Sequence, residues 1–163
     1  MDMFEHLLQA NASVAEGFPH AGLPRDPAWR LAVLTCMDSR VDPRSFLGIN
    51  PGDAHVLRNA GGRVTEDVLR SLTVSIGLMG VTAVAVVHHT DCGLQARSFA
   101  LRDTLAAAGV SGTGLELHSF TDLEESVRDD VAMLERNPVV RLRAHVRGFI
   151  YRVEDGRLTA VRP

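Results

Sequence analysis

The chain has 163 residues, 45% of them hydrophobic and 23% charged, and its formal net charge at pH 7 is -3. This length suits a single domain over residues 1–163 with a hydrophobic core, and the slightly acidic balance argues against nucleic acid as a partner. A membrane partner is not expected either, and we predict a cytoplasmic protein, because no apolar run approaches the roughly 20 residues of a bilayer span and residues 1–15 lack the pattern of a signal peptide.

The first 27 residues are predicted to form a helical arm. Apolar side chains at Phe4, Leu7 and Leu8 give residues 3–15 the pattern of a weak amphipathic helix. A connector that contains Gly and Pro follows as far as residue 27, so the arm is suited to docking on another surface.

Three apolar segments are predicted to be β-strands. Residues 31–36 and 81–87 are short, continuous apolar runs of the kind that is buried on both faces of a parallel sheet, and residues 54–58 form a weaker candidate. Between these segments, Thr65 and the two acidic residues after it predict the start of a helix, which Gly80 is placed to end.

The second half of the chain predicts two more helices and a hairpin. One helix covers residues 92–109; after a Gly- and Ser-rich loop, another opens with the capping-box sequence Thr121-Asp-Leu-Glu124 and ends at about Arg136. Asp155-Gly156 then separates two strand-like segments, which predicts a type I′ turn and antiparallel pairing. The expected fold class is therefore α/β, with a mostly parallel central β-sheet flanked by helices and an antiparallel C-terminal hairpin.

Two motifs place metal-type ligands directly after predicted strands. Cys36 closes one strand within a Cys-x-Asp-x-Arg sequence, and His89 and Cys92 follow another within His-x-x-Cys. Because ligands bind at the carboxyl ends of parallel strands, we expect these groups at one edge of the sheet. Thiolate and imidazole together suit Zn²⁺, whereas Mg²⁺ or Ca²⁺ would need oxygen ligands. We predict a three-ligand zinc site with an open fourth position, beside Asp38 and Arg40.

Taken together, the two motifs resemble the β-class carbonic anhydrases, whose pattern is Cys-x-Asp-x-Arg at the first strand end and His-x-x-Cys at the third. Agreement extends to Pro51-Gly-Asp53, to Arg58-Asn-Ala-Gly-Gly62 and to the closing segment 148–157. The resemblance covers most of the chain from about Leu31 onward, and it is greatest to the short prokaryotic members of the family.

The resemblance implies that Cys36, His89 and Cys92 bind zinc and that Asp38 and Arg40 form a catalytic dyad. In such sites zinc lowers the pKa of bound water to roughly 7, which gives a hydroxide that attacks carbon dioxide and yields bicarbonate and a proton. Arg40 would hold the Asp38 carboxylate with its planar fork. In the family this aspartate also swings onto the metal as a fourth ligand.

Further roles follow from the same resemblance. Asn59, Gly61 and Gly62 would bring backbone close to the substrate, since glycine permits contacts that a side chain blocks. Family members associate as dimers or larger assemblies, so we expect a homodimer or homotetramer in which residues 1–27 pack on a partner subunit. The small-molecule partners would be carbon dioxide and bicarbonate.

Other interpretations remain open. Carbonyl sulfide and carbon disulfide are linear analogues of carbon dioxide, so hydrolysis of either is an alternative on the same scaffold, as is a noncatalytic zinc- or bicarbonate-sensing protein. A thiol redox protein is disfavoured by the absence of Cys-x-x-Cys. His88 fits a hydrogen-bonded structural histidine better than a proton relay. His55 is the other candidate for a proton relay. Asp91 fits a helix cap better than a ligand.

Overall fold

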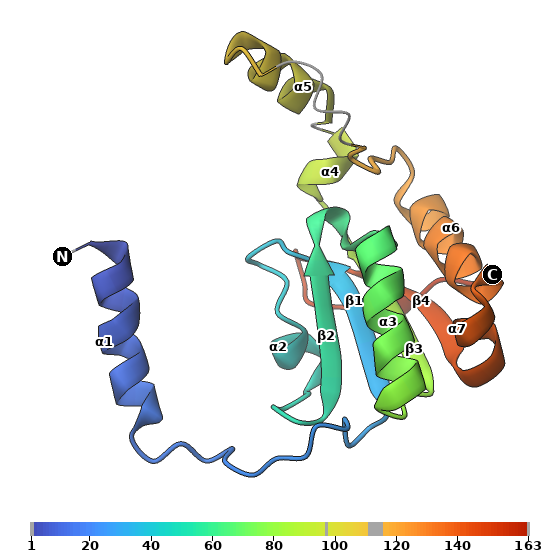
Figure 1. The fold of residues 1–163 in the computed structure, drawn as a ribbon. Coiled ribbons are helices and arrows are strands. Elements are labelled where there is room, and N and C mark those ends of the chain that lie inside the picture. The colour runs from blue at the N-terminus through green and yellow to red at the C-terminus, as the bar shows by residue number, and fades with distance from the viewer. Residues whose placement is uncertain (1, 97, 111–115, 163) are drawn as a thin grey trace.

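The structure is a computed structural model that describes residues 2–96, 98–110 and 116–162, and a five-stranded sheet forms its centre (Figure 1). The strand order is β2-β1-β3-β4-β5, with β1 to β4 parallel and β5 antiparallel to β4. The strands are β1 (Leu31–Cys36), β2 (Ala54–Asn59), β3 (Ala83–His89), β4 (His145–Tyr151) and β5 (Leu158–Ala160). This architecture confirms the predicted fold class.

The strand pairing explains where β3 begins and ends. Residues 81–87 were predicted, but the register starts at Leu31 opposite Ala83, so the two residues before Ala83 lie beyond the start of β1. At the other end, β4 continues the pairing through His88 and His89. The predicted strand at 31–36 is confirmed at both ends, and β2 extends one residue past its predicted end.

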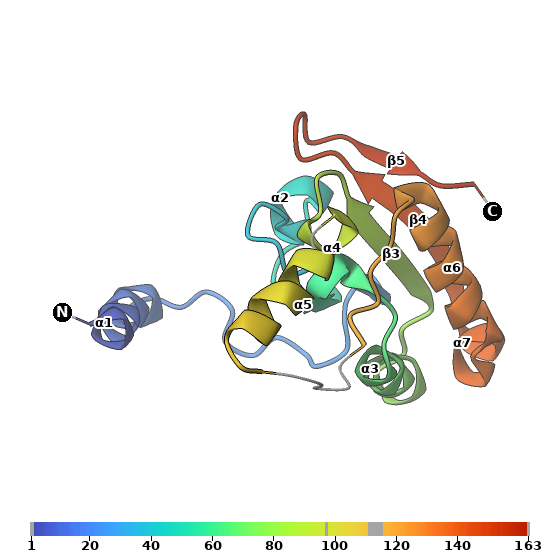
Figure 2. The same cartoon turned by 90° about the horizontal axis from the view of Figure 1, so that it is seen from above.

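Helices cover both faces of the sheet, and three of them share one side. Figure 2 shows α3 (Glu66–Leu78), α6 (Leu123–Arg136) and α7 (Pro138–Arg143) on that side. Their apolar side chains pack with those of β1 and β3 in the main core, which includes Ala32, Leu34, Val68, Leu72, Ile76, Val84, Val86, Leu134 and Val140. The short α2 (Pro43–Leu47) lies on the other side, where Phe46 stacks on Tyr151 of β4 at 4.2 Å between ring centroids.

Helix α6 packs closely against strand β4. A Cβ atom at Gly148 would lie 2.3 Å from Cγ1 of Val127 and 3.2 Å from Cγ2 of Val131. Only a residue without a side chain fits there, so α6 rests directly on the backbone of β4. This contact brings the inner face of α6 next to the end of β3.

Several helix boundaries differ from the predictions. α6 is capped by Asp122, whose Oδ1 accepts from the N–H of Glu125 at 2.8 Å, and not by Thr121, in line with the stronger preference for Asp at this position. A further short helix, α7, was not predicted. The helix expected over 92–109 is present as α4 (Gly93–Ala96) and α5 (Ser98–Ala107); residue 97 and the Gly- and Ser-rich residues 111–115 lie outside the described residues.

The C-terminal hairpin is confirmed, although its turn type is not. Gly156 has φ of 73°, but Asp155 is not in the left-handed region, and type I′ requires positive φ at both central residues. The loop is instead longer: the Arg152 N–H donates to the Arg157 carbonyl at 2.9 Å and the Gly156 N–H to the Arg152 carbonyl at 2.8 Å.

The predicted N-terminal helix is present as α1 (Met3–Ala15), which stands away from the rest of the chain (Figure 1). Asp2 caps it by accepting from the backbone N–H groups of Phe4 and Glu5. None of its residues is buried, so apolar side chains such as Phe4 and Leu8 are exposed at 75% and 73%. None of the helices in the described part of the chain combines the length and apolar character that crossing a membrane requires.

Candidate metal centre

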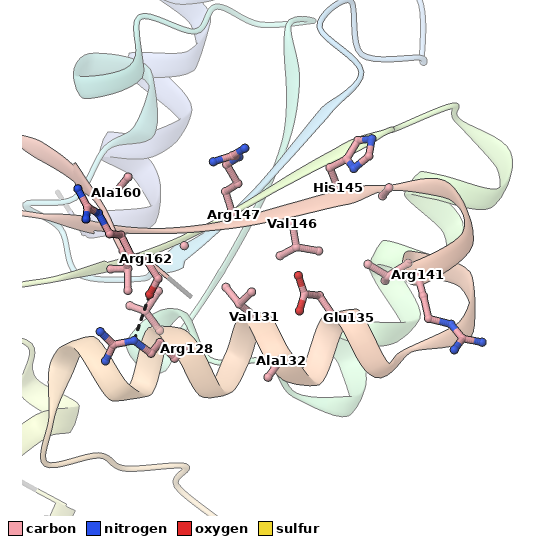
Figure 3. Close-up of a pocket in the computed structure, with 15 residues that line it drawn as sticks. Arg128, Val131, Ala132, Glu135, Arg141, His145, Val146, Arg147, Ala160 and Arg162 are labelled. Carbon is pink, nitrogen blue, oxygen red and sulfur yellow. Dashed lines mark hydrogen bonds between the residues drawn. The ribbon is translucent and has the colours of Figure 1, made fainter.

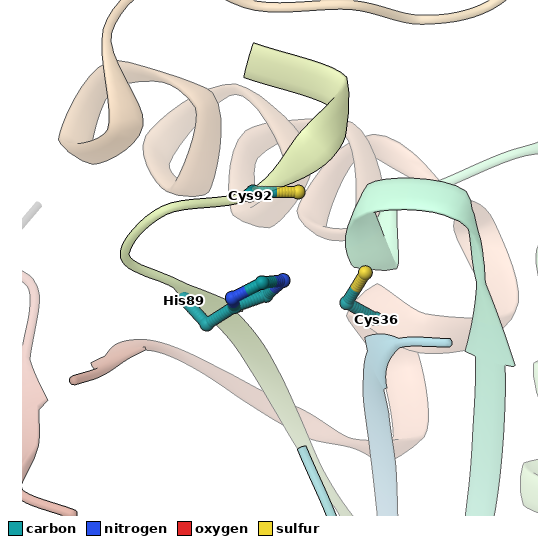
Figure 4. Close-up of side chains that lie close together, drawn as sticks. All are labelled: Cys36, His89 and Cys92. Carbon is teal, nitrogen blue, oxygen red and sulfur yellow. The ribbon is translucent and has the colours of Figure 1, made fainter. Parts of the chain in front are cut away.

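The three predicted ligands meet at the carboxyl edge of the sheet. Cys36 is the last residue of β1, His89 is the last of β3, and Cys92 directly precedes α4. Their ligand atoms all lie within 4.8 Å of one another, and all three residues are buried. Figure 4 shows the two sulfurs and the imidazole converging from these separate segments. Neighbouring parallel strands therefore produce the cluster, as the sequence predicted.

The hydrogen bonds of His89 leave one ring nitrogen free to bind a metal. Nδ1 donates to the carbonyl oxygen of Thr90 at 2.8 Å, which places the lone pair on Nε2. Nε2 is buried and has no hydrogen-bond partner among the described residues. A buried nitrogen without a partner carries a desolvation cost that a metal ion would remove. The cluster thus fits a bound cation.

The pKa values of the two cysteines also favour a bound cation. Hydrogen bonding from the Cys92 thiol, with smaller contributions from the neighbouring His89 ring and from backbone N–H groups, outweighs burial and lowers the pKa of Cys36 from 9.0 to about 4. The Cys36 thiolate in turn raises the pKa of Cys92, and burial adds to that effect. Two adjacent anions repel each other, so a divalent cation is what allows both sulfurs to be thiolates at neutral pH.

The Asp38 carboxylate lies at the margin of the cluster and is held by Arg40. Arg40 Nη2 donates to Oδ2 at 2.7 Å and Nε donates to Oδ1 at 3.0 Å, a bidentate pair. Hydrogen bonds from the Arg40 guanidinium hold the pKa of Asp38 well below its usual range. Asp38 Oδ2 is 3.9 Å from His89 Nε2, so the ionised carboxylate faces the cluster without joining it.

Asp91 is a second acidic partner of Arg40. Its Oδ2 lies 2.8 Å from Arg40 Nη1, and its carbonyl oxygen accepts from Nη2 at 3.1 Å. Asp91 has φ of 53°, unusual for a residue other than glycine, and it lies between His89 and Cys92 in sequence. The Asp91 carboxylate therefore helps to position the guanidinium that holds Asp38, a contact that was not predicted, while its role as a helix cap remains a prediction.

The loop after β2 packs against the end of β1. Gly61 and Gly62, in the 3₁₀ turn η1 (Ala60–Gly62), both have positive φ, and the backbone N–H of Gly61 contributes to the lowered pKa of Cys36. The Asn59 side chain closes this loop, donating to the Arg63 carbonyl at 2.8 Å and accepting from its N–H at 2.9 Å. The loop therefore supports Cys36, while substrate contacts by Asn59 and the two glycines remain a prediction.

Substitution of Gly62 by alanine tests how closely this loop must approach β1. A Cβ atom there would lie 2.9 Å from the Thr35 carbonyl carbon and 3.0 Å from the Cys36 nitrogen, and φ is 67°. We expect Gly62→Ala to lower the free energy of unfolding by about 2–5 kcal/mol in urea titrations, through backbone strain plus overpacking. Gly48→Ala is the matched control, because φ there is 66° and no atom lies within 4 Å. Equal losses in the two variants would show that the close contact is unimportant.

Several residues that support the site were not singled out from the sequence. Arg58 donates from Nε to the Cys36 carbonyl at 3.0 Å and from Nη2 to the Asp38 carbonyl at 2.7 Å, bracing the exit of β1. Asp130 is buried on α6 beside Arg63 and His88. The signal for Asp130 was its position, since residues 127, 130, 131 and 134 share one helical face, on which a charged side chain is unexpected.

The two histidines considered for proton relay lie in different surroundings. Both ring nitrogens of the buried His88 face protein groups, Ser126 Oγ at 2.8 Å and Asp130 Oδ2 at 3.1 Å, as expected of a structural histidine. His55 lies near the start of β2, away from the carboxyl edge, where Nδ1 is 2.7 Å from Ser75 Oγ. A relay through either histidine remains a prediction.

A groove of the described structure lies away from the candidate metal centre. It has a volume of about 770 Å³ and runs between α6 and the strands β4 and β5, lined by residues such as Val131, Glu135 and Val146 (Figure 3). It shares no residue with the Cys36, His89 and Cys92 cluster. The candidate chemistry therefore does not lie in this groove.

Known proteins share both the sequence and the fold. The family model described as carbonic anhydrase matches residues 31–111. The chain is 38% identical to beta-carbonic anhydrase 1 of Mycobacterium tuberculosis over 167 residues, with 100% of each chain covered. It is 33% identical to a carbon disulfide hydrolase of Acidianus sp. over 162 residues, which cover 84% of this chain and 78% of that protein.

The crystal structure of a carbonic anhydrase from Streptococcus mutans has the same fold. It matches with a TM-score of 0.92 and 41% sequence identity, covering 99% of each chain. Full-length similarity at this level confirms the resemblance drawn from the two motifs. The chain therefore belongs to the β-carbonic anhydrase family.

Proposed function

We propose that this protein catalyses the reversible hydration of carbon dioxide to bicarbonate and a proton, with Zn²⁺ held by Cys36, His89 and Cys92. The observation that carries the proposal is the buried sulfur, nitrogen and sulfur cluster, whose imidazole Nε2 has no other partner in the described structure. Family membership supports it, and so does the ionised Asp38 carboxylate beside the cluster.

The residues around the cluster have separate tasks in this proposal. Bound zinc supplies the positive charge that lets a water molecule act as a nucleophile near neutral pH. Asp38 accepts a hydrogen bond from the attacking oxygen and orients its lone pair toward carbon dioxide. Arg40 keeps Asp38 ionised and in place, and the Thr90 carbonyl keeps His89 in the tautomer that offers Nε2.

The test is stopped-flow hydration of carbon dioxide, followed with a pH indicator on protein whose zinc content has been measured. We expect activity to rise in proportion to bound zinc and to disappear when a chelator removes it. Zinc-loaded protein without hydration activity would overturn the proposal, and it would favour the noncatalytic sensing role instead.

Carbon disulfide or carbonyl sulfide hydrolysis is the second candidate. It is favoured by the 33% identity to a carbon disulfide hydrolase. The linear substrates are alike, so the ligand motifs do not distinguish the two activities. Only the measured preference for one substrate over another does. The same zinc-loaded sample should therefore be assayed in parallel with all three substrates, and a larger kcat/KM for a sulfur-containing substrate would select the second candidate.

We further infer that the protein is a homodimer or a larger homo-oligomer in which α1 packs on a partner subunit. Large exposed apolar side chains on one helix are costly in water and mark an interaction surface.

Both cysteines are free thiols, which is consistent with the reducing cytoplasm as the compartment.

Substitution of two apolar residues on α1 tests this assembly. Phe4 and Leu8 are one helical turn apart and exposed. We expect Phe4→Ser/Leu8→Ser to reduce the mass measured by light scattering toward the 17.7 kDa of one chain. Gln9→Ala/Asn11→Ala is the matched polar control and should leave the mass unchanged. A wild-type protein that is monomeric at assay concentrations would contradict the inference.

A further inference from the structure

A second buried polar cluster lies behind the metal centre, and we call it the Asp130 cluster. It consists of Arg63, His88, Ser126 and Asp130. Asp130 is 1% exposed, and it is the one acidic residue that is buried among residues 2–96, 98–110 and 116–162. Burial of a carboxylate is unfavourable unless it is paired and hydrogen-bonded.

Two basic side chains approach Asp130 from different segments. His88 Nε2 lies 3.1 Å from Oδ2, a distance at which the ring N–H donates to the carboxylate. Arg63 Nη2 donates to Oδ1 at 3.3 Å. Arg63 Nε is 2.8 Å from Oδ2, which makes an ion pair, although its N–H does not point along a hydrogen bond. Asp130 thus joins α6 to both segments.

The two partners of Asp130 are next to the two halves of the metal centre. His88 immediately precedes the ligand His89 on β3. Arg63 follows the η1 turn, which packs so closely on Cys36 that a Cβ atom at Gly62 would lie 3.0 Å from the Cys36 backbone nitrogen. One carboxylate therefore contacts both the segment that presents the imidazole and the loop that supports the first thiolate.

Phe120 gives the Asp130 cluster a third connection to the metal centre. Its ring stacks on His88 with centroids 5.8 Å apart, and the Arg63 guanidinium lies 5.5 Å from the same ring. Phe120 also packs with Cys36 and Cys92 in a small core of its own. The Asp130 cluster and the three ligands are consequently in one continuous packed region.

We propose that Asp130 is a positioning residue for the metal centre. Through Arg63 and His88 it fixes the η1 loop, which supports Cys36, relative to the end of β3. The inference rests on the proposed metal site. A buried ion pair is weak support for stability, since well-packed apolar residues in its place are often as stable. Its specific effect is geometric: Asp130 holds two segments at the spacing that the ligands need.

The decisive variant is Asp130→Asn, which keeps the size of the side chain and removes its charge. Its matched control is Asp129→Asn, at the exposed neighbouring position on the same helix. We expect Asp130→Asn to weaken zinc binding by about 10- to 100-fold in competition with a coloured chelator, the range for groups that support metal ligands. Asp129→Asn should bind zinc as tightly as the wild type.

A spectroscopic measurement separates positioning from general destabilisation. With Co²⁺ in place of zinc, the visible absorption bands report the coordination geometry, and the near-ultraviolet bands report the metal–sulfur bonds. Recorded well below the melting temperature of each protein, the bands of Asp130→Asn should be shifted and those of Asp129→Asn unchanged. An Asp130→Asn protein with wild-type zinc affinity and wild-type cobalt bands would overturn the proposal.

A second variant covers the case in which Asp130→Asn does not fold because Arg63 is left unpaired. Arg63→Met/Asp130→Leu replaces both charges together with apolar side chains. The folded double variant should show the same weakened zinc binding and the same shifted cobalt bands as Asp130→Asn. If it instead binds both metals as the wild type does, or if neither variant folds, the Asp130 cluster serves stability alone and the inference is overturned. If the wild type itself binds neither zinc nor cobalt, it is the proposed metal site that fails.

Discussion

Cys92→Ser is expected to lose its zinc and, with it, its hydration activity. A serine hydroxyl is a poor ligand for a borderline-soft cation, and the remaining two ligands cannot hold the metal as tightly. We expect zinc affinity to fall by more than about 100-fold, the upper end of the range for groups that merely support a ligand. Metal analysis after gel filtration and stopped-flow hydration on the same sample measure both effects.

Metal-free wild-type protein is the reference for this variant. The two should have equal residual activity and similar far-ultraviolet circular dichroism. Excess zinc should raise the melting temperature of the wild type, since a ligand that binds only the folded state stabilises it, and it should leave that of Cys92→Ser unchanged. A variant that retains equimolar zinc would contradict the assignment of Cys92 as a ligand.

Asp38→Ala is expected to keep its zinc and to lose most of its activity. Asp38 is not one of the three clustered ligands, so the cluster remains complete without it. The lost interaction is the hydrogen bond that orients the attacking oxygen, and we expect kcat to fall by about 100-fold or more, within the usual range for a positioned acid–base group. Zinc content and hydration rate, measured together, distinguish this result from loss of metal.

The matched control is Asp67→Ala, which removes the carboxylate from another contact of an aspartate with an arginine, one in which both guanidinium nitrogens donate to a single oxygen. Arg70 Nη2 and Nε lie 2.8 and 3.0 Å from Asp67 Oδ1, and both residues are exposed on α3. Such a surface pair contributes little to stability, and it is distant in sequence from the ligands, so activity should be unchanged. Full activity of Asp38→Ala would exclude the Asp38 and Arg40 dyad from the mechanism.

The clustering of Cys36, His89 and Cys92 was predictable because local patterns indicate it. Cys36 and His89 each follow a run of apolar residues, which identifies a strand by itself, and parallel strands end at a common edge. The boundaries were less predictable: β3 begins at Ala83 because β1 begins at Leu31, and this depends on the register between segments distant in sequence. The N-cap of α6 fell on Asp122 where Thr121 offered a nearly equivalent alternative.

Residue type and short-range periodicity were enough to predict that Cys36, His89 and Cys92 come together, with Asp38 and Arg40 beside them, and that the fold is α/β. Two sets of contacts became visible in the folded chain alone: Arg40 is shared by Asp38 and Asp91, and Asp130 on α6 contacts both Arg63 and His88. The contacts of Arg40 with Asp91 and of Asp130 with Arg63 and His88 join residues far apart in the chain, and those of Asp130 also require α6 to pack on Gly148 of β4. Patterns along the chain carry no information about such distances, which packing alone sets.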